Sequence, residues 1–157
     1  MSPDEQNSLP TFLQAEKAGW DELEGLVESL SPEQAETTGY LPGWSVKDFL
    51  AHVAGWLSEA SLALEQIKAG TYTGGDVDVD ARNDTFVDAN RDQPLSIVLF
   101  EAKMTHRRLL HHLHDRTDIP PSAVASLRKA GPRHYAEHLP RLREWVAELR
   151  SKESPPQ

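Results

Sequence analysis

Three histidines in two distant stretches of the chain have the residue type and the spacing of a metal site. His134 and His138 are four residues apart, so on a helix both imidazoles lie on one face and can reach one ion. His52 lies at the edge of an apolar helix face, between Phe49 and Trp56. Three neutral imidazoles that leave one position open are typical of catalytic sites for metals such as zinc or nickel. These residues are therefore candidate ligands of a divalent metal.

The same spacing has simpler explanations, which the sequence leaves open. A pair of histidines four residues apart can be hydrogen-bonded at a helix interface without an ion, and His52 alone can be a satisfied core residue. Three further histidines, His111, His112 and His114, cluster at the expected end of a helix. There they complement the helix dipole and meet water, so we do not expect them to form the site.

Two other titratable residues fall on apolar helix stripes. Glu16 is four residues from both Phe12 and Trp20, which suits a general acid or base, or a partner of a ligand histidine. A glutamate at the edge of the stripe that reaches solvent is the alternative. His106 lies in the middle of another stripe, three residues before Leu109, and we expect it in the core or lining a substrate pocket.

Amphipathic helices must position these side chains. Apolar residues recur at three- and four-residue steps in four long segments, and this pattern predicts an all-α four-helix bundle in a single domain, residues 1–157. The core is expected over about 9–150, between polar termini at 1–8 and 151–157. The expected long helices cover about 9–30, 45–70, 94–115 and 132–150, with short ones after Pro32 and over 121–130. Residues 71–91 are expected to form a long connection with one helical turn near 84–89.

Charge and composition exclude several classes of function. The formal net charge is −9 and no basic stripe offsets it, so nucleic acids and anionic membranes are not expected partners. The first ten residues lack the pattern of a signal peptide, and no apolar run is long enough for a membrane span, so we expect a cytoplasmic protein. The chain has no Cys, which excludes thiolate ligands, disulfides and a cysteine nucleophile.

Two motifs resemble those of a known superfamily. Residues Gly43–Trp56, GWSVKDFLAHVAGW, resemble the second-helix motif of the DinB-like metalloenzymes, and His134–Leu139, HYAEHL, resembles their final-helix motif. The stretch 83–113 is similar to members related to the mycothiol-dependent maleylpyruvate isomerase N-terminal domain and to the ClbS/DfsB group. The resemblance implies a bundle with a metal near one end. His52 would then take the place of the second-helix ligand, and His134 and His138 that of the final-helix pair.

The resemblance also implies a class of activity. Its characterised members include thiol-dependent isomerases and transferases that use mycothiol or bacillithiol, and the ClbS group hydrolyses a strained cyclopropane. The sequence departs from the isomerases, which carry a further C-terminal domain and in some cases a Glu among the ligands. Some ClbS-type members do not rely on a metal, so the reaction of one relative does not transfer directly.

We therefore expect a metal-dependent thiol transferase, isomerase or hydrolase that acts on a small electrophilic molecule. Mycothiol or another low-molecular-weight thiol would be the cosubstrate, since the chain has no thiol of its own. Residues expected near the bundle mouth, and so in the substrate pocket, are Trp56, Arg82, Asn83 and His106. One alternative is a non-catalytic protein that binds a toxic small molecule for self-resistance. Another is a purely structural bundle, and a homodimer is the expected assembly in that case.

Overall fold

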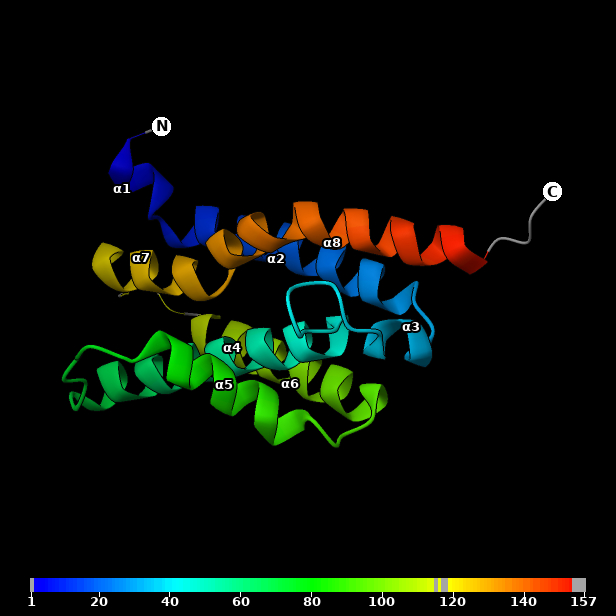
Figure 1. Cartoon of the computed structure of the whole chain (residues 1–157). Helices are drawn as coiled ribbons and strands as arrows, with labels where there is room; N and C mark the ends of the chain where they lie inside the picture. Colours follow the sequence, from blue (N-terminus) through cyan, green and yellow to red (C-terminus); the bar gives the residue numbers. More distant parts are fainter. Residues whose placement is uncertain (1, 115, 117–118, 154–157) are drawn as a thin grey trace.

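The computed structural model of the chain describes residues 2–114, 116 and 119–153, and this part is all-helical. None of its helices has the length and apolar character that crossing a membrane requires. The helices in chain order (Figure 1) are α1 (Pro3–Gln6), α2 (Leu9–Glu28), α3 (Pro32–Glu36), α4 (Val46–Ala69), α5 (Val79–Asn90), α6 (Leu95–Leu113), α7 (Pro121–Ala130) and α8 (Pro132–Glu153).

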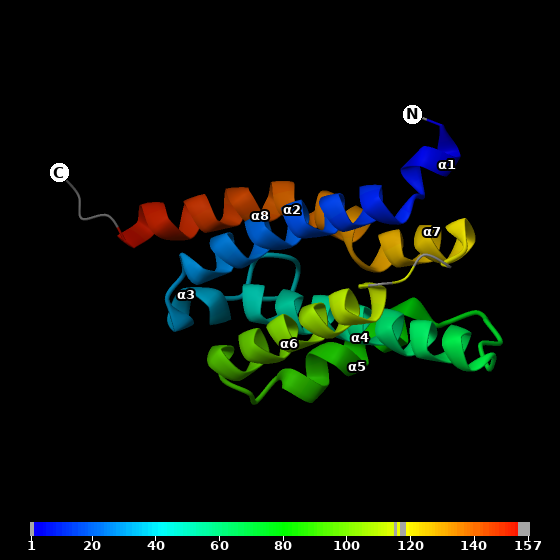
Figure 2. The same ribbon diagram turned by 180° about the vertical axis from the view of Figure 1, so that it is seen from behind.

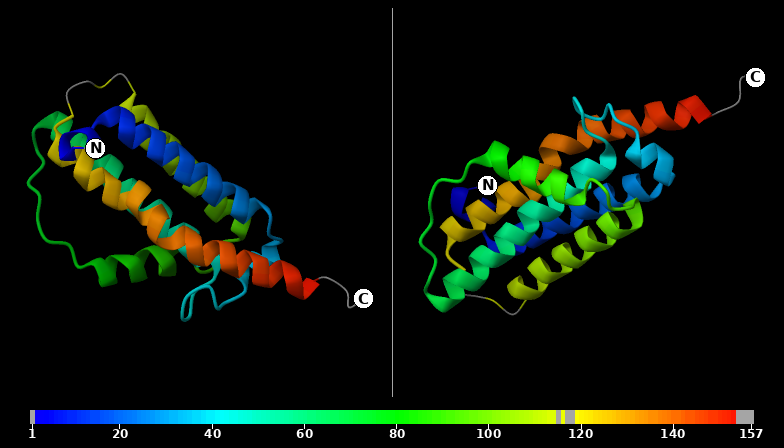
Figure 3. Two further views of the ribbon diagram at one scale, coloured as in Figure 1. Left: turned by 90° about the horizontal axis from the view of Figure 1, so that it is seen from above. Right: turned by 60° about the horizontal axis from the view of Figure 1, so that its bottom comes forward.

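Four long helices form the bundle that the sequence predicts. Helices α2 and α8 run side by side in one layer, and α4 and α6 pack together in the other, as Figures 1 and 2 show from opposite sides. Helix α5 lies against the outside of α4, and α7 packs on the beginning of α8. The connection between α4 and α5 runs along the outside of the bundle (Figure 3).

The apolar stripes of these helices meet in one core. Each long helix buries side chains at three- and four-residue spacing, because that spacing gathers them on one face of the helix. The most deeply buried include Phe12, Leu23 and Val27 of α2, Leu50, Val53, Leu57 and Leu64 of α4, Val98 and Leu109 of α6, and Leu142 and Val146 of α8.

The start of α4 is fixed by polar contacts. Ser45 and Asp48 form the capping box that the sequence predicts, with each side chain accepting from the other residue's backbone N–H. The buried ammonium of Lys47 donates to Glu36 and to the backbone carbonyls of Arg91 and Gln93. These bonds tie α3 and the end of α5 to the first turn of α4, the helix that carries His52.

Helix α5 differs most from the expectation of one turn near 84–89. It runs over Val79–Asn90, with the Asp78 side chain accepting from the backbone N–H of Ala81 at its start. Sequence periodicity gives little sign of it, because Val87 is its one buried residue. The Phe86 ring occupies the space where any residue larger than glycine at position 55 would place its Cβ. Helix α5 therefore exists through docking on α4 rather than through its own amphipathic pattern.

The ends of the chain also differ from the expected pattern. Helix α8 continues to Glu153, past the predicted end at 150, and the polar segment before residue 9 contains α1. Helix α6 ends at Leu113, and the predicted limit at Asp115 lies outside the described residues. Ser2 caps α1 by accepting from the backbone N–H of Glu5, which explains how so polar a segment forms a helical turn.

Candidate metal centre

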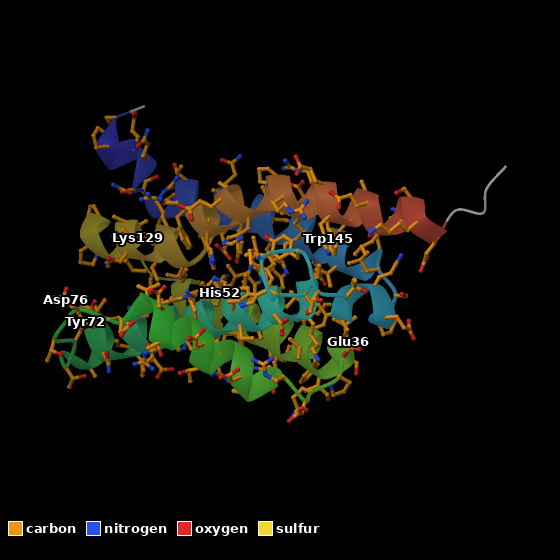
Figure 4. The ribbon with its side chains drawn as sticks, viewed as in Figure 1. Glu36, His52, Tyr72, Asp76, Lys129 and Trp145 are labelled. Atoms are coloured by element: carbon orange, nitrogen blue, oxygen red, sulfur yellow. The ribbon has the colours of Figure 1, made fainter. Side chains whose placement is uncertain are left out.

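The three candidate ligands come from the early turns of two helices. His52 lies in the second turn of α4, and His134 and His138 lie in the first two turns of α8. Figure 4 shows His52 in the interior of the bundle, between the layer that contains α4 and the layer that contains α8. Pro132 begins α8, where its missing N–H costs nothing, so the helix starts close to His134.

The structure brings the three imidazoles together. The Nε2 atoms of His52 and His134 are 2.6 Å apart. One ring nitrogen from each of His52, His134 and His138 lies within 4.8 Å of the other two. The ring centroids are separated by 4.6, 4.9 and 5.9 Å, with the planes steeply inclined to one another. The rings therefore converge on one point instead of turning outward to solvent.

Burial keeps these imidazoles neutral. Desolvation, followed by the neighbouring His134 and His138, lowers the pKa of His52 to about 3, against a smaller opposing effect of the Asn83 side chain. Desolvation and His138 lower the pKa of His134 to about 4, opposed by the backbone of Ala130 and by Glu137. The pKa of His138 is also lowered by burial. Near neutral pH each ring therefore keeps a lone pair for a cation.

Tyr40 orients the third imidazole. Its hydroxyl lies 3.0 Å from Nδ1 of His138 and donates to the backbone carbonyl of His138 at 3.4 Å. The phenol oxygen is then free to accept from Nδ1–H, and a proton on Nδ1 leaves the lone pair on Nε2. Arg141 donates to the backbone carbonyls of Gly39 and Tyr40 and holds their loop against α8. Nothing in the sequence pattern singled out Tyr40, because its partner lies 98 positions away.

An aromatic wall surrounds the three rings. Phe49 packs 4.7 Å from the His138 ring, and Trp44 packs 5.1 Å from the His52 ring, measured between ring centroids. The Nδ1 atoms of His52 and His134 are buried and have no hydrogen-bond partner among the described residues. Neutral nitrogen donors in a largely apolar setting fit zinc or nickel, which accept imidazole ligands readily. The residues present therefore fit a divalent metal of this kind.

Trp56 and Asn83, two of the predicted substrate-binding residues, lie beside the centre. The indole Nε1 of Trp56 donates to Oδ1 of Asn83 at 2.8 Å. The Asn83 side chain in turn raises the pKa of the His52 imidazole, against the larger effect of burial. Trp56 also lines a cavity of about 620 Å³. Arg82 pairs through Nη1 with Glu59, another lining residue of that cavity, at 3.3 Å, and its side chain is half exposed.

Glu16 and His106 belong to a separate buried cluster. Glu16 has no exposed surface, and its Oε1 accepts from the Tyr135 hydroxyl at 2.7 Å and lies 3.2 Å from Nε2 of His106. The His106 ring stacks on Trp20 with ring centroids 4.2 Å apart. The inward orientation predicted for Glu16 is confirmed, and the alternative of a solvent-facing glutamate is wrong. Among the described residues, no polar contact joins this cluster to the three-histidine centre, and His106 does not line the cavity.

The cluster nevertheless lies next to the centre in the chain. Tyr135, which donates to Glu16, directly follows His134. Gly131 makes room for the carboxylate, because a Cβ at position 131 would overlap Oε2 of Glu16. Glu16 therefore braces the first turn of α8 through Tyr135, and among the described residues its polar contacts are to Tyr135 and His106 and to none of the three candidate ligands. The predicted role of Glu16 as a general acid or base stays a prediction. The histidines at the end of α6 face outward, with His112 paired to Glu65 at 3.0 Å.

Comparisons with known proteins agree with this architecture. The model of the mycothiol maleylpyruvate isomerase N-terminal domain family matches residues 17–149. The crystal structure of an uncharacterised protein from Escherichia coli UTI89 superposes with a TM-score of 0.78 at 17% sequence identity, covering 90% of this chain and 94% of the other, so it shares the fold. No curated protein matches the chain. The predicted DinB-like bundle is thus confirmed, and the chain belongs to the mycothiol maleylpyruvate isomerase N-terminal domain family.

Proposed function

We propose that this chain is a metal-dependent enzyme that transfers a low-molecular-weight thiol, such as mycothiol, to a small electrophilic molecule. The observation that carries the proposal is the convergence of the ring nitrogens of His52, His134 and His138 within 4.8 Å of one another. A divalent cation bound there would supply Lewis acidity, which lowers the pKa of a coordinating thiol. The chain supplies no thiol of its own, because it contains no Cys.

The chain's own residues have distinct parts in this proposal. The three imidazoles provide neutral donors because burial lowers their pKa values. The Tyr40 hydroxyl, which lies beside Nδ1 of His138, would fix the tautomer of that imidazole. Trp56 and Asn83, which are hydrogen-bonded to each other, would supply an apolar ring and an amide group beside His52. In the overall reaction a sulfur–carbon bond forms, the thiol proton leaves to water, and the electrophile takes up a proton. That balance requires neither an oxidant nor a reductant.

Metal removal and repletion test the proposal. The purified chain is treated with a chelator, dialysed, and reloaded with zinc or nickel, and thiol consumption is then followed with mycothiol and a small electrophile. We expect metal bound in a one-to-one ratio and thiol transfer that depends on it. A matched control is His111→Ala, because His111 is an exposed histidine at the far end of α6. Absence of stoichiometric metal in the wild-type protein would overturn the proposal.

Binding without catalysis is the second candidate. The cavity of about 620 Å³ beside Trp56 is much larger than the three-histidine centre requires, so it could hold a toxic molecule as it stands. The same assay separates the two. Protection that saturates at one molecule per chain, with no thiol adduct formed, favours sequestration, whereas repeated turnover favours the enzyme.

A further inference from the structure

The cavity beside the metal centre has its own chemical character. It lies between the second half of α4, the connection from α4 to α5, and α7. Two of its lining residues, Trp56 and Ala130, are four positions along the chain from His52 and His134. Trp56 also donates to the Asn83 amide, and the Asn83 side chain raises the pKa of His52. The three histidines are not among the lining residues, so a molecule in the cavity would have one end near the centre.

The lining is predominantly apolar. Its walls combine large side chains, such as Ile67 and Leu127, with small ones, such as Ala63 and Ala123, which leave the space open. The volume, about 620 Å³, is within the range of roughly 300–1,000 Å³ found for small-molecule sites. A cavity of this volume suits a ligand of drug-like size.

Exposed apolar side chains gather at this cavity. Leu62, Tyr72 and Val77 are each about half exposed, and all three line it. Exposed apolar side chains that gather in one place are typical of binding sites, whereas singly scattered ones are ordinary. Figure 4 shows Tyr72 at the end of the molecule where the connection between α4 and α5 lies. A bound apolar molecule would cover these side chains and remove their surface from water, which is favourable.

The charges around the cavity disfavour anions. Among the described residues, its lining contains Glu59 but no Lys or Arg, and Lys129 of α7, labelled in Figure 4, is not one of the lining residues. Arg82, the cation beside Glu59, is already paired with that carboxylate. The connection over the cavity carries exposed Asp76 and Asp78, and the whole chain has a formal charge of −9. A carboxylate entering the cavity would find like charges and no cation to pair with.

We infer that the cavity binds an uncharged, largely apolar electrophile, with its reactive end toward Trp56 and Ala130, and that it discriminates against carboxylates. This inference rests on the proposed function for the reaction, but the binding it describes needs neither thiol nor metal. The inferred substrate class follows from the lack of a cation among the described lining residues, together with the apolar side chains that the molecule would cover.

Two probes of nearly the same shape test the inference on the full chain, with and without zinc. N-phenyl-1-naphthylamine is uncharged, and 1-anilinonaphthalene-8-sulfonate adds one sulfonate to that skeleton. Both report binding by fluorescence. We expect the uncharged probe to bind with one site per chain and the sulfonate to bind at least about tenfold more weakly. Equal or tighter binding of the sulfonate would overturn the inference.

Two variants locate the binding. Ala123→Phe fills the cavity and should weaken the uncharged probe by about tenfold or more, whereas Ala147→Phe, on an exposed face of α8, should leave it unchanged. Gln66→Lys places a cation in the lining and should strengthen sulfonate binding. If Ala123→Phe binds the uncharged probe as tightly as Ala147→Phe does, the probe binds elsewhere and the inference is wrong. Circular dichroism confirms that each variant is folded.

Turnover separates this inference from the proposed function. Selective binding of the uncharged probe in this cavity, with no metal-dependent thiol transfer, refutes the proposed function and leaves the binding assignment in place. Thiol transfer that proceeds with equal kcat/KM for an ester electrophile and for its free carboxylate refutes the discrimination alone.

Discussion

The Nε2 atoms of His52 and His134 lie 2.6 Å apart, although 82 positions of the chain separate the two residues. Helix α4 supplies one and α8 the other, so neither helix holds the centre alone. His138, one turn further along α8, brings a third nitrogen to the same point, and Tyr40 fixes its orientation. The centre is thus a product of helix packing, and its properties can be tested one contact at a time.

Removing a ligand should strongly weaken metal binding. In His52→Ala, two nitrogens remain, and we expect the affinity for zinc to fall by at least about a hundredfold, since losing even an indirect partner of a ligand costs about 10–100-fold. Competition with a chromophoric chelator measures the affinity. His111→Ala, which changes an exposed histidine, should bind zinc as the wild type does. Unchanged affinity in His52→Ala would show that this residue is not a ligand.

Tyr40→Phe tests the orientation of His138. The variant keeps the ring that packs on Phe49 but loses the hydroxyl 3.0 Å from Nδ1. We expect zinc affinity to fall by about tenfold, because the tautomer and the ring direction are no longer fixed. Tyr72→Phe is the matched control, since the Tyr72 side chain is half exposed on the connection to α5. Equal affinities in the two variants would mean that Tyr40 does not act on the centre.

The stability of the metal-free protein should fall on acidification below about pH 6.5, the ordinary pKa of histidine. Burial lowers the pKa of His52 to about 3 and that of His134 to about 4, so in this range the unfolded chain binds more protons than the folded one. The free energy of unfolding therefore decreases as the pH falls, with the loss continuing toward pH 4. Urea denaturation between pH 8 and 5 measures the slope.

The contribution of carboxylates to the pH dependence of stability can be separated from that of the histidines. Arg143 and Lys103 lower the pKa values of Glu22 and Glu24, so these acids lose their contribution only when the pH falls through their ordinary pKa of 4.5 and below. Between pH 6.5 and 5 the histidines dominate. His52→Gln should accordingly have a shallower slope in that window. A wild-type stability that stays constant from pH 7 to pH 5 would contradict the assignment of neutral buried imidazoles.

Gly131→Ala should destabilise the fold, whereas Gly25→Ala should not. A Cβ at position 131 would overlap Oε2 of Glu16, a fully buried carboxylate, and we expect a loss of about 1–3 kcal/mol in the free energy of unfolding. At position 25, inside α2, the added methyl meets nothing within 4 Å, and the helix should gain about 0.5–1 kcal/mol. Chemical denaturation of both variants measures the difference. Similar stabilities would show that Glu16 does not brace the start of α8.

The local sequence pattern alone was sufficient to predict the long helices and to predict which site residues share a helix face. A residue's place on a helix follows from 3.6-residue periodicity, which is why the shared face of His134 and His138 could be predicted from the sequence. For Glu16 the sequence left an inward and a solvent-facing orientation open, and the structure shows it buried. The capping box at Ser45 followed from two residue types three positions apart. The first half of α5 and the docking of Phe86 had no such local signal, because α5 has one buried residue of its own and Phe86 depends on space left by Gly55.

Tertiary packing alone decided which of these residues meet. The sequence placed His134 and His138 on one helix face and His52 at the edge of another apolar face, but only the packing of the two layers brings their nitrogens to one point. The same packing gives His138 its Tyr40 contact, directs Arg82 to Glu59 and separates His106 from the cavity. The physical reason is that periodicity fixes directions around one helix axis, whereas contacts between helices depend on how side chains of many residues interdigitate.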